Sequence, residues 1–234
     1  MPLKTLVTGY PRGATRWAYR VLKSAGCDVG FCSVFTENSN NQYTYKAVAE
    51  APVDIEVSWF SAPFIYHPAL KDVNIVRLER HPLLVANSLS WLGAFSPAHN
   101  THMTKWYSIM SRHVGGLESK YRGCPGQSML HFVCEWARKI LQLSQYEDTC
   151  VKVEDGEHKL LIACGESCAE LEGVVPPCNV SGCPAVADAL GLGDNDAILD
   201  MRRLLVERNY YWMNGDERAL LGAYSNGLYV PSGV

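Results

Sequence analysis

The chain opens with a short apolar run, a glycine-containing turn and an amphipathic helical pattern, and this order limits the possible folds most strongly. Residues 3–8 (LKTLVT) have the composition of a short buried strand. Residues 9–13 (GYPRG) form a turn, and from Ala14 the apolar residues follow helical spacing until Gly26. A strand, a turn and a helix make the first part of a βαβ unit, so we expect a parallel sheet.

The rest of the chain continues the alternation of strands and helices. We expect strands over 73–78, 149–153 and, less regular, 54–60, helices over 82–91 and 127–146, and polar loops over 36–46 and 93–102. A Gly- and Pro-rich connection spans 173–184. The pattern predicts a single α/β domain over residues 1–234, with a mainly parallel sheet flanked by helices and a more helical part from about residue 156.

Composition and charge exclude several classes of protein. Of the 234 residues 47% are apolar, enough for one sizeable core, and the net charge of −3 gives no basic field for nucleic acid or an anionic membrane. No run approaches the roughly 20 apolar residues of a membrane span. The apolar run 3–7 is too short for a signal peptide, so we expect a cytoplasmic protein without a membrane span.

Nine cysteines leave three interpretations open. Four of them gather late in the chain, at Cys164, Cys168, Cys178 and Cys183. Free thiols in a reducing compartment are favoured, because neither spacing in this group is the C-x2-C typical of zinc sites. A zinc site and a pair of local disulfides are the alternatives.

The first candidate binding motif lies where the first strand passes into the first helix. A helix N-terminus has unpaired N–H groups and partial positive charge, so it attracts phosphate. Gly13 allows close approach of the backbone, and Arg12 and Thr15 add side-chain donors. The turn has no lysine and does not match the Walker A pattern of P-loop kinases. An ordinary strand–helix turn is the alternative interpretation.

The second candidate motif follows the strand over 73–78. Arg80 at a strand end can bind a phosphate through its planar guanidinium, and Ser88 lies two turns into the next helix. Taken alone, a surface arginine followed by a helical serine is the simpler interpretation.

Both motifs resemble those of the sulfotransferases that use 3′-phosphoadenosine 5′-phosphosulfate (PAPS). Residues 8–17 (TGYPRGATRW) are similar to the 5′-phosphosulfate loop of that family, T-Y-P-K-S-G-T-T-W. Residues 80–88 (RHPLLVANS) are similar to its 3′-phosphate motif, R-[ND]-P-x-D-x-x-x-S. Weaker similarity at residues 56–59 (EVSW) and 152–155 (KVED) extends the resemblance over residues 3–155.

The resemblance implies a P-loop-like sulfotransferase fold, PAPS as the donor and no metal. It implies that Arg12 contacts the bridging oxygen of the donor, that Thr15 binds the 5′-phosphate and that Trp17 stacks on adenine. The implied nucleotide-binding residues are Arg12, Gly13, Ala14, Thr15, Arg16, Trp17, Arg80 and Ser88. The chain departs from the loop pattern at Gly13, Ala14 and Arg16 and lacks the late R-K-G clamp, for which Arg202, Arg203 or Arg208 could substitute.

A hydroxyl acceptor needs a general base, and the family histidine is absent. Ser58 occupies its position, and Gly30-Phe31-Cys32 stands where bacterial members carry G-H-E. Our first candidate is Glu37, which follows the first helix as in glutamate-using members, and our second is Glu56. Further candidates are His67, His99 and His102.

The acceptor is open at this point. Aromatic residues near the polar loops suit a sugar or an apolar alcohol, although core packing explains most of them, so we expect a small-molecule or glycan acceptor. Two other functions remain: a P-loop nucleotide kinase-like phosphotransferase, and a non-catalytic nucleotide-binding protein of the sulfotransferase fold.

Overall fold

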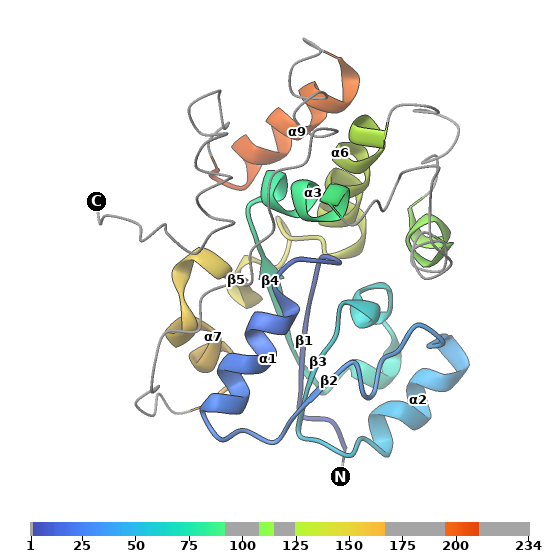
Figure 1. Cartoon of the computed structure of the whole chain (residues 1–234). Helices are drawn as coiled ribbons and strands as arrows, with labels where there is room; N and C mark the ends of the chain where they lie inside the picture. The colour runs from blue at the N-terminus through green and yellow to red at the C-terminus, as the bar shows by residue number, and fades with distance from the viewer. Residues whose placement is uncertain (1, 92–107, 115–124, 167–194, 211–234) are drawn as a thin grey trace. The chain divides into compact units, whose positions relative to one another are not determined.

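The computed structural model describes residues 2–91, 108–114, 125–166 and 195–210 (Figure 1). The chain groups into two compact units, residues 1–80 with 137–177 and residues 81–136 with 178–234. The expectation of a single domain over residues 1–234 stays a prediction.

The first unit contains a five-stranded parallel sheet. Its strands are β1 (Thr5–Gly9), β2 (Val29–Phe31), β3 (Ile55–Val57), β4 (Asn74–Glu79) and β5 (Cys150–Lys152), in the order β2-β3-β1-β4-β5. All pairs are parallel. The predicted α/β class with a parallel sheet flanked by helices is therefore confirmed.

β1 occupies the centre of the sheet, and all five of its residues are buried. Val7 is in register with Val57 of β3 on one side and Val76 of β4 on the other. The chain first builds β2 and β3 on one side of β1 and then crosses to β4 on the other. Ligands of open parallel sheets bind where this order reverses, so the carboxyl ends of β1 and β4 are the expected site.

Helices cover both faces of the sheet. α1 (Thr15–Ser24) and α7 (Glu157–Ala163) pack on the face to which Val7 and Leu78 point. Leu6 points to the other face and packs with α2 (Asn41–Ala49) and the 3-10 turns η1 (Trp59–Phe64) and η2 (Pro68–Leu70). Figure 1 shows α1 and α2 on opposite sides of β1. The short turns η4 (Glu147–Thr149) and η5 (Val153–Asp155) flank β5.

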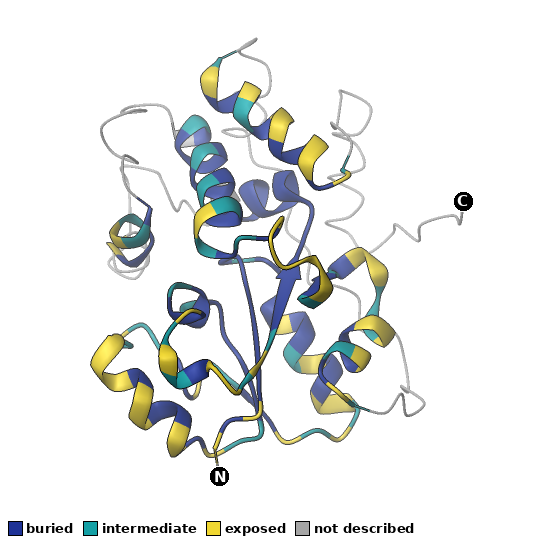
Figure 2. Cartoon of the chain, turned by 180° about the vertical axis from the view of Figure 1, so that it is seen from behind, coloured by how far each residue is buried: buried dark blue, intermediate teal, exposed yellow. Residues whose placement is uncertain are grey.

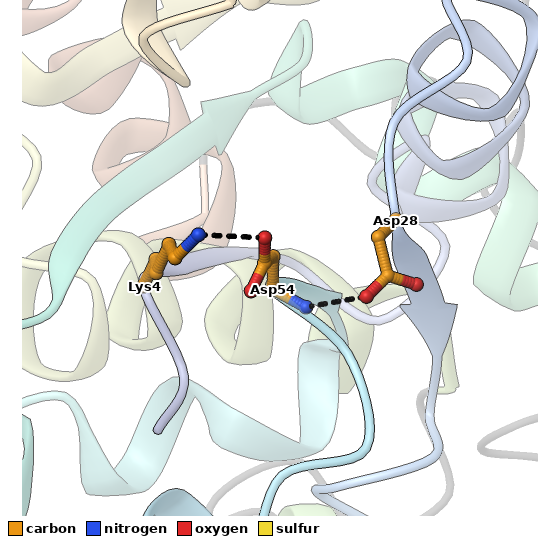
Figure 3. A network of polar contacts seen from close by, with 3 residues as sticks. All are labelled: Lys4, Asp28 and Asp54. Atoms are coloured by element: carbon orange, nitrogen blue, oxygen red, sulfur yellow. Dashed lines mark hydrogen bonds and ion pairs between the residues drawn. The ribbon is translucent and has the colours of Figure 1, made fainter. Parts of the chain in front are cut away.

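The amino ends of the strands are joined by a small polar network (Figure 3). The Nζ of Lys4 donates to Asp54 Oδ2 at 2.7 Å, and the backbone N–H of Asp54 donates to Asp28 Oδ2 at 3.2 Å. The ion pair is solvent-exposed, so its contribution to stability is small. This network lies at the edge of the sheet opposite to the expected ligand site, and we assign it a structural role.

The second unit is helical where it is described. It contains α3 (Pro82–Trp91), a helical segment over 108–113, α6 (Pro125–Glu135) and α9 (Asp196–Glu207), and α6 packs against both α3 and α9. The π-helical turn η3 (Trp136–Ile140) follows α6 in the sequence. Among the described residues, no helix has the length and apolar character needed to cross a bilayer.

Several expected boundaries were wrong for identifiable reasons. The helix expected over 127–146 ends at Ile140, and Gln142 adopts a left-handed φ of 47°. The loop expected over 36–46 contains the start of α2, because Asn40 Oδ1 accepts a hydrogen bond from the Tyr43 N–H and caps the helix. The strand expected over 54–60 ends at Val57, and β2 was not anticipated.

Candidate functional site

The loop between β1 and α1 has an unusual backbone. Arg12 and Ala14 adopt left-handed φ values of 64° and 69°, on either side of Gly13. The Gly13 N–H donates to the Tyr10 carbonyl at 2.9 Å. A Cβ on Gly13 would lie 2.9 Å from the Tyr10 backbone nitrogen and oxygen, so a larger residue does not fit without a shift of the loop. The loop is therefore a tight turn that depends on glycine.

The N-terminus of α1 lacks the groups that usually neutralise a helix start. Ala14 is the N-cap residue and makes no side-chain capping bond, and the first turn contains no acidic residue. The first N–H groups of a helix carry partial positive charge, and left-handed residues before a helix aim successive N–H groups at one point. Thr15, buried, begins the helix there. This end of α1 has the electrostatic character of an anion site.

Arg80 of the second motif contacts the first motif. It follows the last residue of β4, it is 6% exposed, and its Nη1 donates to the Arg12 carbonyl at 3.2 Å. Gly9 permits close packing of the two strands, since a Cβ there would lie 2.9 Å from the Leu78 carbonyl oxygen. The structure thus brings Arg12, Gly13 and Arg80 together within the first unit. Ser88 is buried on α3 and belongs to the second unit.

Glu56 is buried among hydrogen-bond donors. Its side chain is fully buried, and Oε1 accepts hydrogen bonds from the backbone N–H groups of Ser33, Val34 and Phe35 at 2.9, 3.0 and 3.2 Å. Oε2 accepts a fourth bond, from the Ser33 hydroxyl, at 2.7 Å. Burial raises the pKa of Glu56 above its ordinary value, and these hydrogen bonds partly oppose the rise.

These hydrogen bonds give Glu56 a structural role, and its candidacy as a general base stays a prediction. In this geometry both oxygens of the side chain accept hydrogen bonds from the loop after β2, and neither is exposed to solvent. Glu56 therefore fixes the loop after β2. Gly30 provides the necessary space, because a Cβ there would lie 2.8 Å from Glu56 Oε2.

Ser58, at the position of the family histidine, is also structural. It is buried, and its hydroxyl donates to the Phe35 carbonyl at 2.9 Å and accepts from the Phe60 N–H at 3.2 Å. The hydroxyl lies 3.5 Å from the Cys32 sulfur. Burial raises the pKa of Cys32 to about 11, which keeps this cysteine a neutral thiol at physiological pH.

Glu37 lies just beyond the segment that Glu56 holds. It is half-buried in a turn closed by two hydrogen bonds, from the Thr36 N–H to the Ser39 hydroxyl at 2.9 Å and from the Ser39 N–H to the Thr36 carbonyl at 3.0 Å. Its candidacy as the base stays a prediction. His67 Nδ1 is engaged with the Ala69 N–H at 3.2 Å, and His99 and His102 lie outside the described residues.

Trp17 is placed differently from the stacking on adenine that the resemblance implied. Trp17 is 2% exposed and packs in the core between α1 and the sheet, so its ring has no open face for adenine. The helical period explains this, because Trp17 shares the buried face of α1 with Val21. Arg16 is exposed, and its guanidinium carbon lies 5.8 Å from the Phe31 ring centroid.

Sequence reasoning missed a second buried carboxylate. Glu79 is the last residue of β4, it is fully buried, and its Oε2 lies 3.3 Å from the Cys150 sulfur on β5. The signal was an apolar strand that ends in an acidic residue directly before Arg80.

The remaining candidates belong to the second unit, to the end of α7 or to the part of the chain outside the described residues. Arg202 and Arg203 are exposed on α9 and Arg208 is buried after it, all in the second unit. Cys164 is a buried free thiol, and Cys168, Cys178 and Cys183 lie outside the described residues.

Comparison of the chain with protein-family models, with curated proteins and with solved structures finds no match.

Proposed function

We propose that this protein is a sulfotransferase that moves a sulfuryl group from PAPS to a hydroxyl or amine acceptor. The observation that carries the proposal is the loop before α1, where left-handed Arg12 and Ala14 precede a helix start without a side-chain cap or an acidic residue. Arg80 is held against the same loop. Together with the resemblance of residues 8–17 and 80–88, this favours a nucleotide with phosphates at the 3′ and 5′ positions of its ribose.

The residues of the loop would act through electrostatics. In sulfuryl transfer the acceptor oxygen bonds to sulfur while the bond from sulfur to the bridging phosphate oxygen breaks, and adenosine 3′,5′-bisphosphate leaves with the bonding electrons. Negative charge grows on the leaving phosphate. Arg12 and the N–H groups of α1 would stabilise that charge, and the fixed loop would require no reorganisation during the reaction. Thr15 would bind the 5′-phosphate and Arg80 the 3′-phosphate.

Glu37 is the proposed general base. It would take the proton from the acceptor hydroxyl as the new sulfur–oxygen bond forms. With Glu56 and Ser58 committed to structure, Glu37 is the carboxylate from the sequence-based candidates that still has some solvent access.

Titration calorimetry tests the nucleotide. We expect the protein to bind adenosine 3′,5′-bisphosphate without magnesium and to bind ATP at least tenfold more weakly, a difference of about 1.4 kcal/mol. Equal or tighter binding of ATP, especially when it needs magnesium, would overturn the proposal and support the kinase-like alternative.

A non-catalytic nucleotide-binding protein is the second candidate. The observation that favours it is the structural use of Glu56 and Ser58, which removes two positions from which a base could act. A screen of alcohol, phenol, amine and sugar acceptors with 35S-labelled PAPS separates the two functions. Label transferred to any acceptor supports the enzyme, whereas tight bisphosphate binding without transfer supports the binding protein.

A further inference from the structure

β2 forms one edge of the sheet, and its outer side is unpaired among the described residues. The Asp28 carbonyl accepts a hydrogen bond from an N–H of β3 at 3.0 Å, and the Cys32 N–H donates one to a β3 carbonyl at 3.1 Å. Alternate residues of a strand direct their N–H and C=O groups to opposite sides, so the groups of Val29 and Phe31 point away from β3. No hydrogen bond between described residues uses these outward groups. The edge can therefore accept a further strand.

Cations and aromatic rings alternate where α1 packs beside β2. The guanidinium carbon of Arg16 lies 5.8 Å from the Phe31 ring centroid. The Phe31 and Tyr19 ring centroids are 5.5 Å apart, and the Lys23 Nζ lies 5.8 Å from the Tyr19 ring centroid. Each residue contacts the next, and we call Arg16, Phe31, Tyr19 and Lys23 the cationic row. Buried and exposed residues alternate along α1 in Figure 2, and both cations of the row are exposed.

The segments that form the row carry no negative charge. Residues 15–24 and 29–36, which make up α1, β2 and the loop after β2, contain no acidic residue. Asp28 lies between them, and its Oδ2 accepts the Asp54 N–H at 3.2 Å, whereas Glu37 follows the second segment and is half-buried. Within the described part of the chain, the two cations of the row make no ion pair. The whole chain has a net charge of −3, so this positive surface is local.

The elements that pack against α1 direct their acidic groups elsewhere. Glu56 of β3 is fully buried and binds the loop after β2. α7 meets the buried face of α1 through Leu160 and Leu161, not the exposed face that carries the cations. In the turn before α7, Asp155 pairs with Lys159 at 2.6 Å. The positive charge of the row is therefore available to a ligand from outside the first unit.

A strand added to β2 would bring its side chains to the row. The Phe31 ring packs on the face of the sheet that α1 covers, and every second side chain of an added strand points to that face. Those side chains repeat every 6.6–6.8 Å or so, roughly twice the rise of one strand residue. Arg16 and Lys23 are seven residues apart on a helix, about 10 Å along its axis. Acidic side chains at alternate positions therefore lie within reach of both long cations.

The charge of the row also disfavours a second copy of the chain as the added strand. Two β2 edges paired with each other would bring two cationic rows together, and like charges repel. Lysine and arginine beside an edge strand oppose such self-pairing, and the same charges attract an acidic segment.

We propose that the β2 edge binds an extended segment of a partner protein with acidic residues at alternate positions, which pairs with Val29 and Phe31 as a sixth strand. Arg16 and Lys23 are its charge contacts. The inference does not rest on the proposed transferase activity, because peptide binding is measured without nucleotide. Bisphosphate affinity and peptide affinity can each be lost while the other is kept, so the two proposals fail separately.

The test uses the full chain and the peptide acetyl-Ser-Glu-Val-Glu-Val-Glu-Ser-amide, followed by NMR titration at low salt. It should bind with a Kd of about 1 mM or tighter, and the peptide with lysine in place of each glutamate should not bind. With the acidic peptide at ten times its Kd, hydrogen exchange of the Val29 and Phe31 amides should slow by about tenfold.

Backbone methylation separates strand pairing from charge attraction. One peptide carries N-methyl groups on its glutamates and another on its valines. Alternate N–H groups of a strand face opposite edges, so only one of the two sets meets β2. One peptide should lose binding by about tenfold or more, and the other should keep it. Equal binding of the two, whether kept or lost, would overturn the strand pairing.

Substitution of the cations tests the row itself. Arg16→Gln and Lys23→Gln should each weaken binding of the acidic peptide by about threefold, as expected for exposed ion pairs. Lys46→Gln is the matched control, since it removes an exposed lysine from α2 on the other face of the sheet, and it should leave binding unchanged. Circular dichroism confirms that each variant is folded.

Two results would overturn the proposal. The first is no binding of the acidic peptide at about 10 mM, or an equal loss of binding in Lys46→Gln. The second is concentration-dependent dimerisation of Arg16→Gln without peptide binding to the unsubstituted chain, measured by sedimentation. That result would assign the row to the prevention of self-pairing between β2 edges.

Discussion

Two loops at the carboxyl edge of the sheet present several backbone N–H groups, and the loops differ in the hydrogen-bond acceptor that these groups find. In the loop after β2, the N–H groups of Ser33, Val34 and Phe35 all point to the buried carboxylate of Glu56. In the loop after β1, the helix that begins at Thr15 has no side-chain cap and no acidic residue in its first turn. The first loop contains its own anion, and the second is suited to receive one.

The comparison separates a left-handed turn that is held by a side chain of the protein from one that is suited to bind a ligand. Cys32 and Arg12 both have positive φ, 51° and 64°. A left-handed residue other than glycine costs about 1–2 kcal/mol, which the surrounding structure must offset. Glu56 offsets it after β2. After β1 the offset includes the Arg80 bond to the Arg12 carbonyl, and a bound phosphate would add to it.

Removal of the internal anion should have the largest effect. Glu56→Ala leaves three buried N–H groups without their acceptor, and we expect a loss of about 3–5 kcal/mol in the free energy of unfolding. Urea denaturation measures it. A loss below about 1 kcal/mol would mean that water replaces the carboxylate and that the loop after β2 does not depend on Glu56.

Glu56→Gln is the control that isolates the charge. Because burial raises the pKa of Glu56 in the folded state, the part of the stability that depends on its protonation is fully present below the ordinary value of 4.5 and is lost as pH rises through the raised pKa. The glutamine variant cannot titrate, so this part of the pH dependence should disappear. Unchanged pH profiles would contradict the raised pKa.

Glu37→Gln tests the residue that lies just after the loop held by Glu56. If Glu37 is the base, turnover should fall by about a hundredfold or more while affinity for adenosine 3′,5′-bisphosphate stays the same. Steady-state transfer of 35S-sulfate and calorimetry measure the two properties separately. Near-normal turnover would exclude Glu37, and Glu50→Gln, at the exposed residue that caps the C-terminus of α2, serves as the matched control.

Arg80→Ala tests whether Arg80 binds the 3′-phosphate or only holds the loop after β1. Loss of a charge-assisted contact to the 3′-phosphate should weaken binding of the bisphosphate by about 2–3 kcal/mol and binding of adenosine 5′-phosphate by much less. Calorimetry with both nucleotides gives the difference. Equal losses would show that Arg80 acts only by holding the Arg12 carbonyl.

Ala14→Gly should have the smallest effect, and of opposite sign. Glycine accepts a φ of 69° without steric cost, so relief of strain exceeds the added chain entropy and stability should rise by up to about 1 kcal/mol. Ala18→Gly, in the regular part of the same helix, should lower stability by about 1 kcal/mol. Thermal unfolding compares both variants, and a destabilised Ala14→Gly protein would mean that the left-handed alanine is not strained.

The fold was predictable where a pattern is local. The strands over residues 3–8 and 73–78 were predicted because β-branched and apolar residues gather there. Pro82 correctly predicted the start of α3. α2 was missed because its first residues are polar and its start depends on one capping bond from Asn40. Local composition does not report such a bond.

The site was predictable only in part, because burial is a property of the assembled sheet. The proximity of Arg12 and Arg80 followed from placing both motifs at strand ends. The role of Glu56 did not, since nothing near it in the sequence indicates that the N–H groups of Ser33 to Phe35 converge on it. Trp17 was assigned to the ligand although its place on the apolar stripe of α1 indicated the core.

The central position of β1 has a consequence for synthesis on the ribosome. Thr5 pairs with Ile55 on one side and Asn74 on the other, so β1 is made before both of its partners and is fully paired only when the later of them has left the exit tunnel. Until then its apolar side chains are exposed to other nascent chains and to chaperones. Translation that slows before β4 would lengthen this interval and increase aggregation, whereas a pause after β4 would allow the sheet to close.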